Sequence, residues 1–263
     1  MWKGQLKNIL KMALKHYLSS LKSAILCKSL SLFNFSGDIM QTQDYGLIRQ
    51  QESILATNRV LRNTYLLLGL TLLFSALTAG LAMVSNAAPL NPFITIILYM
   101  GLLFGTFKLQ NSGWGLLMVF ALTGFLGYTL GPILNMYIQN FANGSQLIMT
   151  ALGATGIIFF GLSAYALTTR KDFSYLGGFL FAAIMVAFLL GLGAMVFNIS
   201  GLSLVISGAF VLLSAGLILF HTSQIIHGGE TNYIVATVSI YVALYNLFLN
   251  LLALLSAFSG RNN

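Results

Sequence analysis

The stretch His221–Leu252, with the sequence HTSQIIHGGETNYIVATVSIYVALYNLFLNLL, decides the fold of this chain. It consists of two apolar segments joined by the short polar loop His227–Asn232. The first segment contains the titratable His221 and the amide Gln224, and the second contains the amides Asn246 and Asn250. Because most of the remaining chain is apolar, these few polar groups are the first candidates for functional side chains.

The composition places the chain in a lipid bilayer. Of its 263 residues, 57% are hydrophobic and only 7% are charged, whereas a soluble domain carries roughly 25% charged residues. A chain so poor in charge cannot cover itself with a polar surface. The single Cys27 excludes a disulfide framework or a cysteine metal site within one chain. The net charge of +8 comes largely from lysines before residue 30, so no nucleic-acid surface is expected.

The N-terminal part divides into two segments before the membrane domain. Lysines at positions 3, 7, 11 and 15 repeat every four residues and share one helical face. Residues 1–39 are therefore predicted to form a basic amphipathic extension on an anionic leaflet; the alternative is that translation starts at Met40. Residues 40–60 are polar and are predicted to form a cytoplasmic tail. Residues 61–260 form the predicted membrane domain.

Seven apolar stretches follow, each close to the roughly 20 residues that cross the hydrocarbon core as a helix. They predict an all-α membrane protein with seven transmembrane helices, at 62–85, 91–107, 114–138, 147–168, 175–198, 202–226 and 232–258.

Positive charges avoid every second loop between these stretches. The loops after the first, third and fifth stretches carry no Lys or Arg, whereas Lys108 follows the second, and Arg170 and Lys171 follow the fourth. The positive-inside rule then places the N-terminus in the cytoplasm and the C-terminus outside. Arg170-Lys171-Asp172 is interpreted as a topology anchor or as a docking surface for a partner. The candidates for contact on the cytoplasmic side are Lys108, Arg170, Lys171, Asp172, His227, Gly228, Gly229 and Glu230.

Small residues predict how the helices pack. Gly101-x-x-x-Gly105 and Gly127-x-x-x-Gly131 would let neighbouring backbones approach closely. Pro132 is predicted to kink the third helix. Gly124, Gly127 and Gly131 form a narrow face that serves either packing or a hinge.

The sequence holds no HExxH, GxSxG, CxxC or Walker motif. Its acidic residues all fall in the predicted tails or loops, so no pair of carboxylates can meet inside the bilayer; they are Asp38, Asp44, Glu52, Asp172 and Glu230. We expect no enzyme activity, no cofactor and no metal site.

Five stretches together resemble the Bax inhibitor-1 family, and most closely its bacterial YccA branch. The resemblance covers about residues 55–260 and is carried by Val60–Tyr65, Thr123–Asn135, Leu167–Ser174, Ile225–Tyr233 and Tyr241–Phe248. It implies a bundle with a central seventh helix ringed by six others. For the YccA branch it also implies a bacterial inner-membrane protein that binds and restrains the FtsH protease, a membrane-anchored AAA+ zinc enzyme.

The wider family implies an alternative function, a pH-sensitive calcium leak that uses two membrane-embedded aspartates. His221 and Ala243 stand at those two positions in this sequence. Two carboxylates that share a proton therefore cannot form, and calcium prefers the oxygen ligands that these residues lack. We therefore expect a protease modulator whose packed bundle resists extraction, with the leak as the alternative and the oligomeric state open.

The polar residues inside the predicted spans allow two interpretations. His221 is either a functional titratable group or a hydrogen-bonding group between helices. Ala243, Asn246 and Asn250 share one helical face, which is predicted to point into the bundle because amides that face lipid would lack partners. Structural hydrogen bonding is the favoured interpretation for the two amides.

Overall fold

The computed structural model describes residues 57–197 and 200–259, and all of the regular structure in these ranges is helical. The predictions for residues 1–39, and those for 40–56, lie outside the described residues. The helices are Thr57–Val84, α2 (Pro92–Leu109), α3 (Gly113–Asn140), α4 (Gly144–Thr169), α5 (Leu176–Phe197), α6 (Ser200–Ile226) and α7 (Tyr233–Ser259).

These bounds agree with the seven predicted spans to within a few residues. The largest difference is at Thr57, which is already helical although residues 57–60 were predicted as tail. Hydropathy finds only the apolar part of a helix, and a polar first turn can continue the same helix beyond the hydrocarbon core. Six of the described helices are long and apolar enough to cross a membrane. In α5 the qualifying apolar helix, Leu176–Gly191, is shorter, so a seventh crossing stays a prediction.

Polar residues at the turns fix where several helices begin. The Asn91 side chain accepts a hydrogen bond from the Phe93 N–H (2.9 Å), and Pro92 occupies the first turn of α2. The Ser112 hydroxyl accepts from the Trp114 N–H at the start of α3 (3.4 Å). The Asn232 side chain accepts from the Ile234 N–H at the start of α7 (2.9 Å). Each cap satisfies a backbone donor that has no partner within its own helix.

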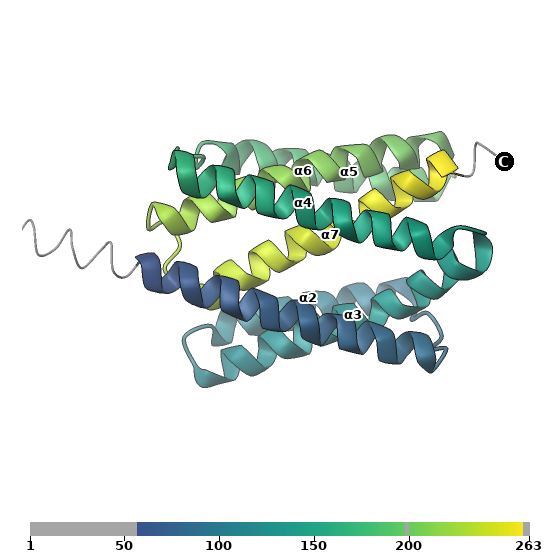
Figure 1. Ribbon diagram of the computed structural model, residues 1–263, viewed down its shortest axis with the longest axis horizontal. Helices are drawn as coiled ribbons and strands as arrows, with labels where there is room; N and C mark the ends of the chain where they lie inside the picture. The colour runs from purple at the N-terminus through teal and green to yellow at the C-terminus, as the bar shows by residue number, and fades with distance from the viewer. Residues whose placement is uncertain (1–56, 198–199, 260–263) are drawn as a thin grey trace, which may run out of the picture. The chain divides into compact units, whose positions relative to one another are not determined.

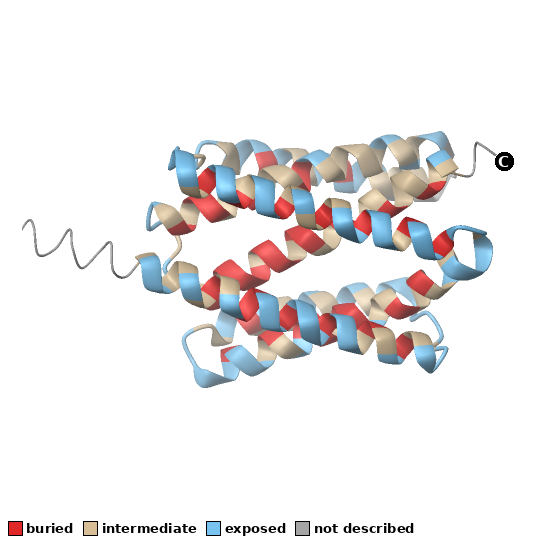
Figure 2. Cartoon of the chain, in the orientation of Figure 1, coloured by how far each residue is buried: buried red, intermediate tan, exposed pale blue. Residues whose placement is uncertain are grey.

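Helix α7 lies at the centre of the described bundle. In Figure 1 it runs diagonally between a group formed by α4, α5 and α6 and a group formed by α2, α3 and the Thr57–Val84 helix. Figure 2 shows buried residues along much of its length. Val238, Tyr241 and Leu247 are among the buried residues of α7. A helix surrounded by others needs apolar residues on all sides, and the α7 sequence supplies them. The predicted central position of this helix is therefore observed.

The expected ring of six helices around α7 needs a correction. Within the described residues, α5 contacts α6 and not α7, and its buried Leu180 and Ala187 pack with Leu213 of α6. The α5 sequence is almost uniformly apolar, so lipid can cover the faces that no helix covers. Helix α5 thus lies outside the ring, with α6 between it and the core.

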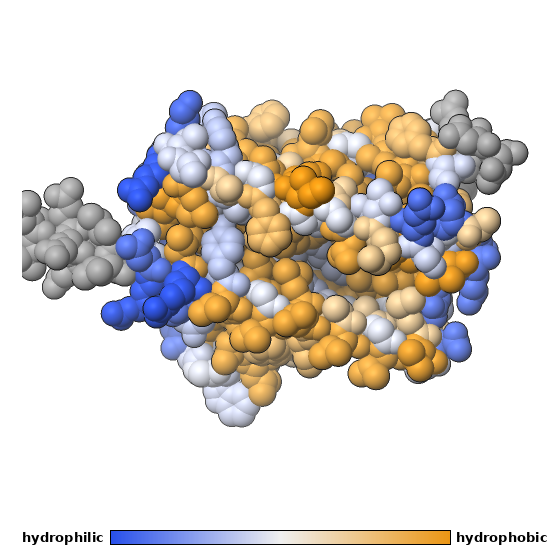
Figure 3. Space-filling model, in the orientation of Figure 1, coloured by the Kyte–Doolittle hydropathy of each residue, from blue (hydrophilic) through white to orange (hydrophobic). Residues whose placement is uncertain are grey.

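The outer surface of the bundle matches a bilayer. Large apolar side chains such as Leu73, Phe160 and Phe181 are at least 66% exposed. Figure 3 shows these residue types as a band between two more polar ends. Lipid removes such an apolar surface from water. The chain is therefore a multi-pass membrane protein.

Glycines in α3 allow the Thr57–Val84 helix to approach closely. A methyl group built on Gly127 would collide with the backbone oxygen of Ser75 and the hydroxyl of Thr78, and one on Gly131 would lie 2.9 Å from the Ala79 oxygen. Gly124 faces the ring of Phe74. The helix α3 continues through Pro132.

The close approach expected at Gly101-x-x-x-Gly105 is not found. Among the described residues, no atom lies within 4 Å of a methyl group built on Gly101, and only the Met118 sulfur does so at Gly105. The spacing alone cannot show whether a neighbouring helix faces the glycines, and here it does not.

Candidate functional site

Three loops meet at one end of the bundle and are joined by hydrogen bonds. They are the α2–α3 loop (110–112), the α4–α5 loop (170–175) and the α6–α7 loop (227–232), and together they are called the loop end below. Asn232 donates from its side chain to the Gln110 carbonyl (3.2 Å) and to the Asn111 side chain (3.0 Å). Gln224, at the end of α6, donates to the Ser174 hydroxyl (3.0 Å). Loops far apart in the sequence thus form one surface.

Ser223 and His227 join the ends of α4 and α6. The buried Ser223 hydroxyl accepts a hydrogen bond from the Phe173 N–H (2.9 Å) and donates to the Lys171 carbonyl (3.3 Å). On the His227 ring, Nδ1 lies 2.9 Å from the Ser223 carbonyl oxygen and 3.3 Å from its hydroxyl. The other ring nitrogen, Nε2, lies 3.0 Å from the Arg170 carbonyl oxygen. His227 therefore contacts the C-terminal ends of two helices at once.

The conformation of the α4–α5 loop is set by Arg170 and Asp172. Arg170 ends α4 in the left-handed region (φ 48°), which is uncommon for a residue other than glycine. The exposed Asp172 carboxylate accepts from the Ser174 N–H at 2.8 Å. Hydrogen bonds from the Ser174 side chain and backbone hold the pKa of Asp172 below its usual range, and the charge of His227 adds to this effect. The carboxylate thus stays ionised near neutral pH.

The predicted loop contact residues Gly228, Gly229 and Glu230 have local structural roles. Gly228 adopts a positive φ of 72°, which glycine tolerates without strain. A side chain on Gly229 would collide with the Gln224 side chain. Glu230 accepts from the Asn232 N–H at 2.8 Å and so supports the residue that caps α7. These residues shape the loop end, whether or not a partner contacts it.

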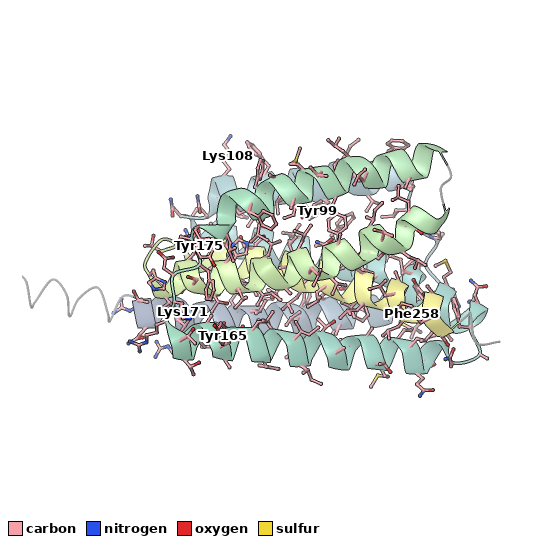
Figure 4. The ribbon with its side chains drawn as sticks, turned by 90° about the horizontal axis from the view of Figure 1, so that it is seen from above. Tyr99, Lys108, Tyr165, Lys171, Tyr175 and Phe258 are labelled. Atoms are coloured by element: carbon pink, nitrogen blue, oxygen red, sulfur yellow. The ribbon has the colours of Figure 1, made fainter. Side chains whose placement is uncertain are left out.

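The charges of the described residues collect at this end. Lys108 lies in the last turn of α2, Arg170 and Lys171 lie at the end of α4, and Arg59 and Arg62 lie in the first turns of the Thr57–Val84 helix. Figure 4 shows Lys108 and Lys171 toward the opposite end of the bundle from Phe258. The loops at the other end, 85–91 and 141–143, contain no charged residue.

The intramembrane candidates do not come together as one site. His221 is half-buried in α6, with its ring at the edge of Phe220. Ala243 is fully buried. Asn246 donates to the Val242 carbonyl (2.9 Å) and Asn250 to the Asn246 carbonyl (2.8 Å), both within α7. The two amides are half-buried and are partnered by their own helix, not by a neighbouring one.

A cavity of about 180 Å³ lies between α2, α3 and α7. The polar members of its largely apolar lining are Thr95, Tyr99, Thr129, Tyr245 and Asn246. The Thr129 and Tyr245 hydroxyls are 3.4 Å apart. Of the intramembrane residues singled out from the sequence, only Asn246 lines this cavity. In the part of the chain that the structure describes, no three His, Cys, Asp or Glu side chains are grouped as a metal site would require.

Sequence reasoning missed the polar cluster at the centre of the bundle. The buried Tyr241 hydroxyl lies 2.6 Å from the Ser75 hydroxyl and donates to the Thr123 carbonyl (3.3 Å). It links α7 to the Thr57–Val84 helix and to α3. A signal was present, because a tyrosine in the middle of a membrane span needs a partner for its O–H.

Comparison with known proteins identifies the class of protein that this fold represents. The sequence profile of the family described as inhibitor of apoptosis-promoting Bax1 matches residues 57–260, which include the whole described helical bundle. The chain therefore belongs to this family, the Bax inhibitor-1 family, as the resemblance implied.

Three bacterial proteins are similar to this chain over most of their length. The chain is 52% identical over 211 residues to the modulator of FtsH protease YccA of Escherichia coli K12, covering 80% of this chain and 94% of the relative. It is 51% identical over 221 residues to an uncharacterised protein of Pseudomonas aeruginosa, covering 84% and 99%. An uncharacterised membrane protein of Vibrio cholerae is 40% identical over 224 residues, covering 85% and 100%.

Proposed function

We propose that this protein resides in a bacterial inner membrane and binds and restrains a membrane-anchored AAA+ protease of the FtsH type. The observation that carries the proposal is the 52% identity, over nearly the full length of the relative, to a protein named as a modulator of that protease. A second relative, from Escherichia coli O6:H1, is also 52% identical over 211 residues and is named as the inner membrane protein YccA. The role is regulatory and not catalytic.

The bundle supplies a physical mechanism for restraint. A protease that extracts its substrates must separate α7 from its neighbours, and α7 is held by buried apolar contacts and by the Tyr241 cluster. The polar residues before the bundle give the enzyme a segment to engage, whereas the packed helices resist its pull. An enzyme engaged in this way is withheld from other membrane substrates.

The loop end is the surface that we assign to the protease. It carries Arg170, Lys171, Asp172 and Glu230, and Lys108 lies next to it in the last turn of α2. Hydrogen bonds hold its three loops in one arrangement. The positive-inside rule puts this end in the cytoplasm. The cytoplasm also holds the ATP that an AAA+ protease hydrolyses.

The calcium leak is the less favoured function. In the described residues the carboxylates are Asp172 and Glu230, and both lie in loops. Ala243, at the position of one family aspartate, is a fully buried methyl group. His221 offers nitrogen, whereas calcium prefers oxygen ligands.

Removal of residues 1–55 is expected to lengthen the lifetime of the protein in cells that contain the protease, because an extracting enzyme needs an accessible segment. Overproduced full-length protein is expected to slow the turnover of other membrane substrates. Pulse-chase measurements of both forms, with and without the protease, test this. Equal lifetimes in all four cases, with no substrate spared, would rule out the modulator function.

Membrane topology gives a second test, which also decides whether α5 crosses. With seven crossings and the positive end inside, a reporter fused after Lys171 is expected to report a cytoplasmic position, and one fused after Asn263 an external one. If both reporters are cytoplasmic, the number of crossings after Lys171 is even, and α5 does not span the bilayer.

A further inference from the structure

The two ring nitrogens of His227 both face backbone carbonyl oxygens. Nδ1 lies 2.9 Å from the Ser223 oxygen and Nε2 lies 3.0 Å from the Arg170 oxygen. A carbonyl oxygen can only accept a hydrogen bond, so each contact needs an N–H on the ring. A neutral imidazole carries one N–H, and an imidazolium carries two. Both contacts are therefore hydrogen bonds only when the ring is doubly protonated.

The neighbouring Ser223 hydroxyl does not remove the need for two ring N–H groups if both carbonyl contacts are to be hydrogen bonds. It has one hydrogen, which can go to the Lys171 carbonyl (3.3 Å) or to His227 Nδ1 (3.3 Å). In the imidazolium form the hydroxyl donates to Lys171, and each carbonyl has its donor. In either neutral form, one ring nitrogen presents a lone pair to a carbonyl oxygen at about hydrogen-bond distance, which is repulsive.

The charges around the ring act on the imidazolium in both directions. His227 follows the last residue of α6, and Arg170 caps the end of α4, so the ring lies at the negative ends of two helix dipoles. The ionised Asp172 adds a favourable charge. The other charged or titratable groups of the elements that meet here are Arg170 and Lys171, which oppose it, Glu230 in the same loop, and His221 in α6.

We propose that His227 is a proton-operated tie, which in its imidazolium form joins the ends of α4 and α6 and fixes the 170–175 loop in the observed conformation. When the ring loses a proton, one of the two hydrogen bonds is lost, and the loop is held less firmly by the remaining bonds of Ser223 and Gln224. The tied state binds one proton more than this loosened state, so lowering the pH favours the tied state. Histidine is the side chain whose charge ordinarily changes between about pH 5 and 8.

The tie would regulate the surface assigned to the protease, and this link rests on the proposed function. A loop that is already fixed loses less conformational entropy on binding. Capture of the protease should therefore be tighter at pH 6 than at pH 8.

The first measurement follows the ring itself. The chain contains three histidines, so histidine labelled with ¹⁵N in the full-length protein in lipid nanodiscs gives few signals, which His227→Gln and His221→Gln assign. At pH 6 the signals lost in His227→Gln are expected to be those of a ring with two bound protons, and at pH 8 those of a neutral ring. A His227 ring that is neutral at pH 5.5 would overturn the proposal.

The second measurement follows the loop by hydrogen exchange. Relative to His227→Gln at the same pH, the amides of residues 170–175 in the unmodified protein should be protected by roughly three- to tenfold at pH 6, the effect of one charge-assisted hydrogen bond at an exposed site. At pH 8 the two proteins should exchange alike. His221→Gln is the matched control and should retain the pH response. Equal exchange of the unmodified protein and His227→Gln at pH 6 would contradict the tie.

The partner measurement separates the two proposals. Purified FtsH-type protease is captured by the full-length protein and by His227→Gln in nanodiscs at pH 6 and pH 8. Several-fold tighter capture at pH 6, lost in His227→Gln, supports the regulatory link. Equal capture at both pH values overturns that link, whereas no capture at either pH overturns the proposed function and leaves the result for the tie intact.

Discussion

Alanine at Gly127 is expected to lower the melting temperature of the purified protein by roughly 5–10 °C, the shift that corresponds to about 2–3 kcal/mol for a domain of this size. The added methyl group would collide with the backbone oxygen of Ser75 and the hydroxyl of Thr78, and would lie 2.7 Å from the Ser75 hydroxyl. A backbone oxygen cannot rotate away, so the two helices must separate. The loss of packing therefore exceeds the gain of about 1 kcal/mol from the better helix propensity of alanine.

The matched control is Gly153→Ala in α4, where no atom lies within 4 Å of the added methyl group. This variant should melt at the same temperature as the unmodified protein or slightly higher. Gly131→Ala should resemble Gly127→Ala, because it meets the Ala79 oxygen at 2.9 Å. Gly124→Ala should cost less, since Phe74 is a side chain and can move. Equal melting temperatures for Gly127→Ala and Gly153→Ala would show that the two helices are not packed at Gly127.

Replacement of Tyr241 by alanine is expected to be at least as damaging, by about 3–5 kcal/mol, the usual cost of removing a large buried ring. The side chain is only 2% exposed and touches the Thr57–Val84 helix and α3 through its hydroxyl. Tyr241→Phe keeps the ring and removes the O–H, which should cost about 0.6–1.7 kcal/mol for hydrogen bonding inside a membrane. Thermal unfolding in detergent measures both.

Tyr175 provides the control pair for this experiment, because it lies at the loop end and is 75% exposed. Tyr175→Ala and Tyr175→Phe should leave the melting temperature within a degree or two of the unmodified protein, as surface changes usually do. The expected order of stability is Tyr241→Phe above Tyr241→Ala, with both below the Tyr175 variants. A Tyr241→Ala protein as stable as Tyr175→Ala would show that α7 is not the centre of the core.

Hydropathy predicted the helices well because the backbone N–H and C=O groups of one apolar stretch in lipid can pair with each other only in a helix. The predicted 91–107 and 202–226 differ from α2 and α6 by no more than two residues at either end. Contacts between helices were harder to predict. Gly101 and Gly127 share the same spacing motif, yet only Gly127 faces another helix, and a one-dimensional pattern does not specify the neighbour.

In the candidate site too, the local structure around a residue was predicted, whereas its contacts with residues far away in the sequence were not. That His227 lies in a loop followed directly from the sequence, but its contact with the Arg170 carbonyl joins residues 57 positions apart. The amides Asn246 and Asn250 were expected to make structural hydrogen bonds, and each donates to a carbonyl one turn earlier in its own helix. Tyr241 was overlooked because its partner, Ser75, is 166 positions away.

The collection of charge at one end also bears on how the chain enters the bilayer during synthesis. The turns at the opposite end, 85–91 and 141–143, and the short connection before α6 carry no ionised side chain, so helices can insert as pairs without carrying a charge through hydrocarbon, a step that costs several kcal/mol. The Thr57–Val84 helix with α2, and α3 with α4, make two such hairpins. With the predicted seventh crossing, α5 and α6 would make a third. Helix α7 is synthesised after the other described helices and also fills the centre. The core around Tyr241 therefore forms only after α7 has been made, and a nascent chain that stops before α7 leaves Ser75 without its partner.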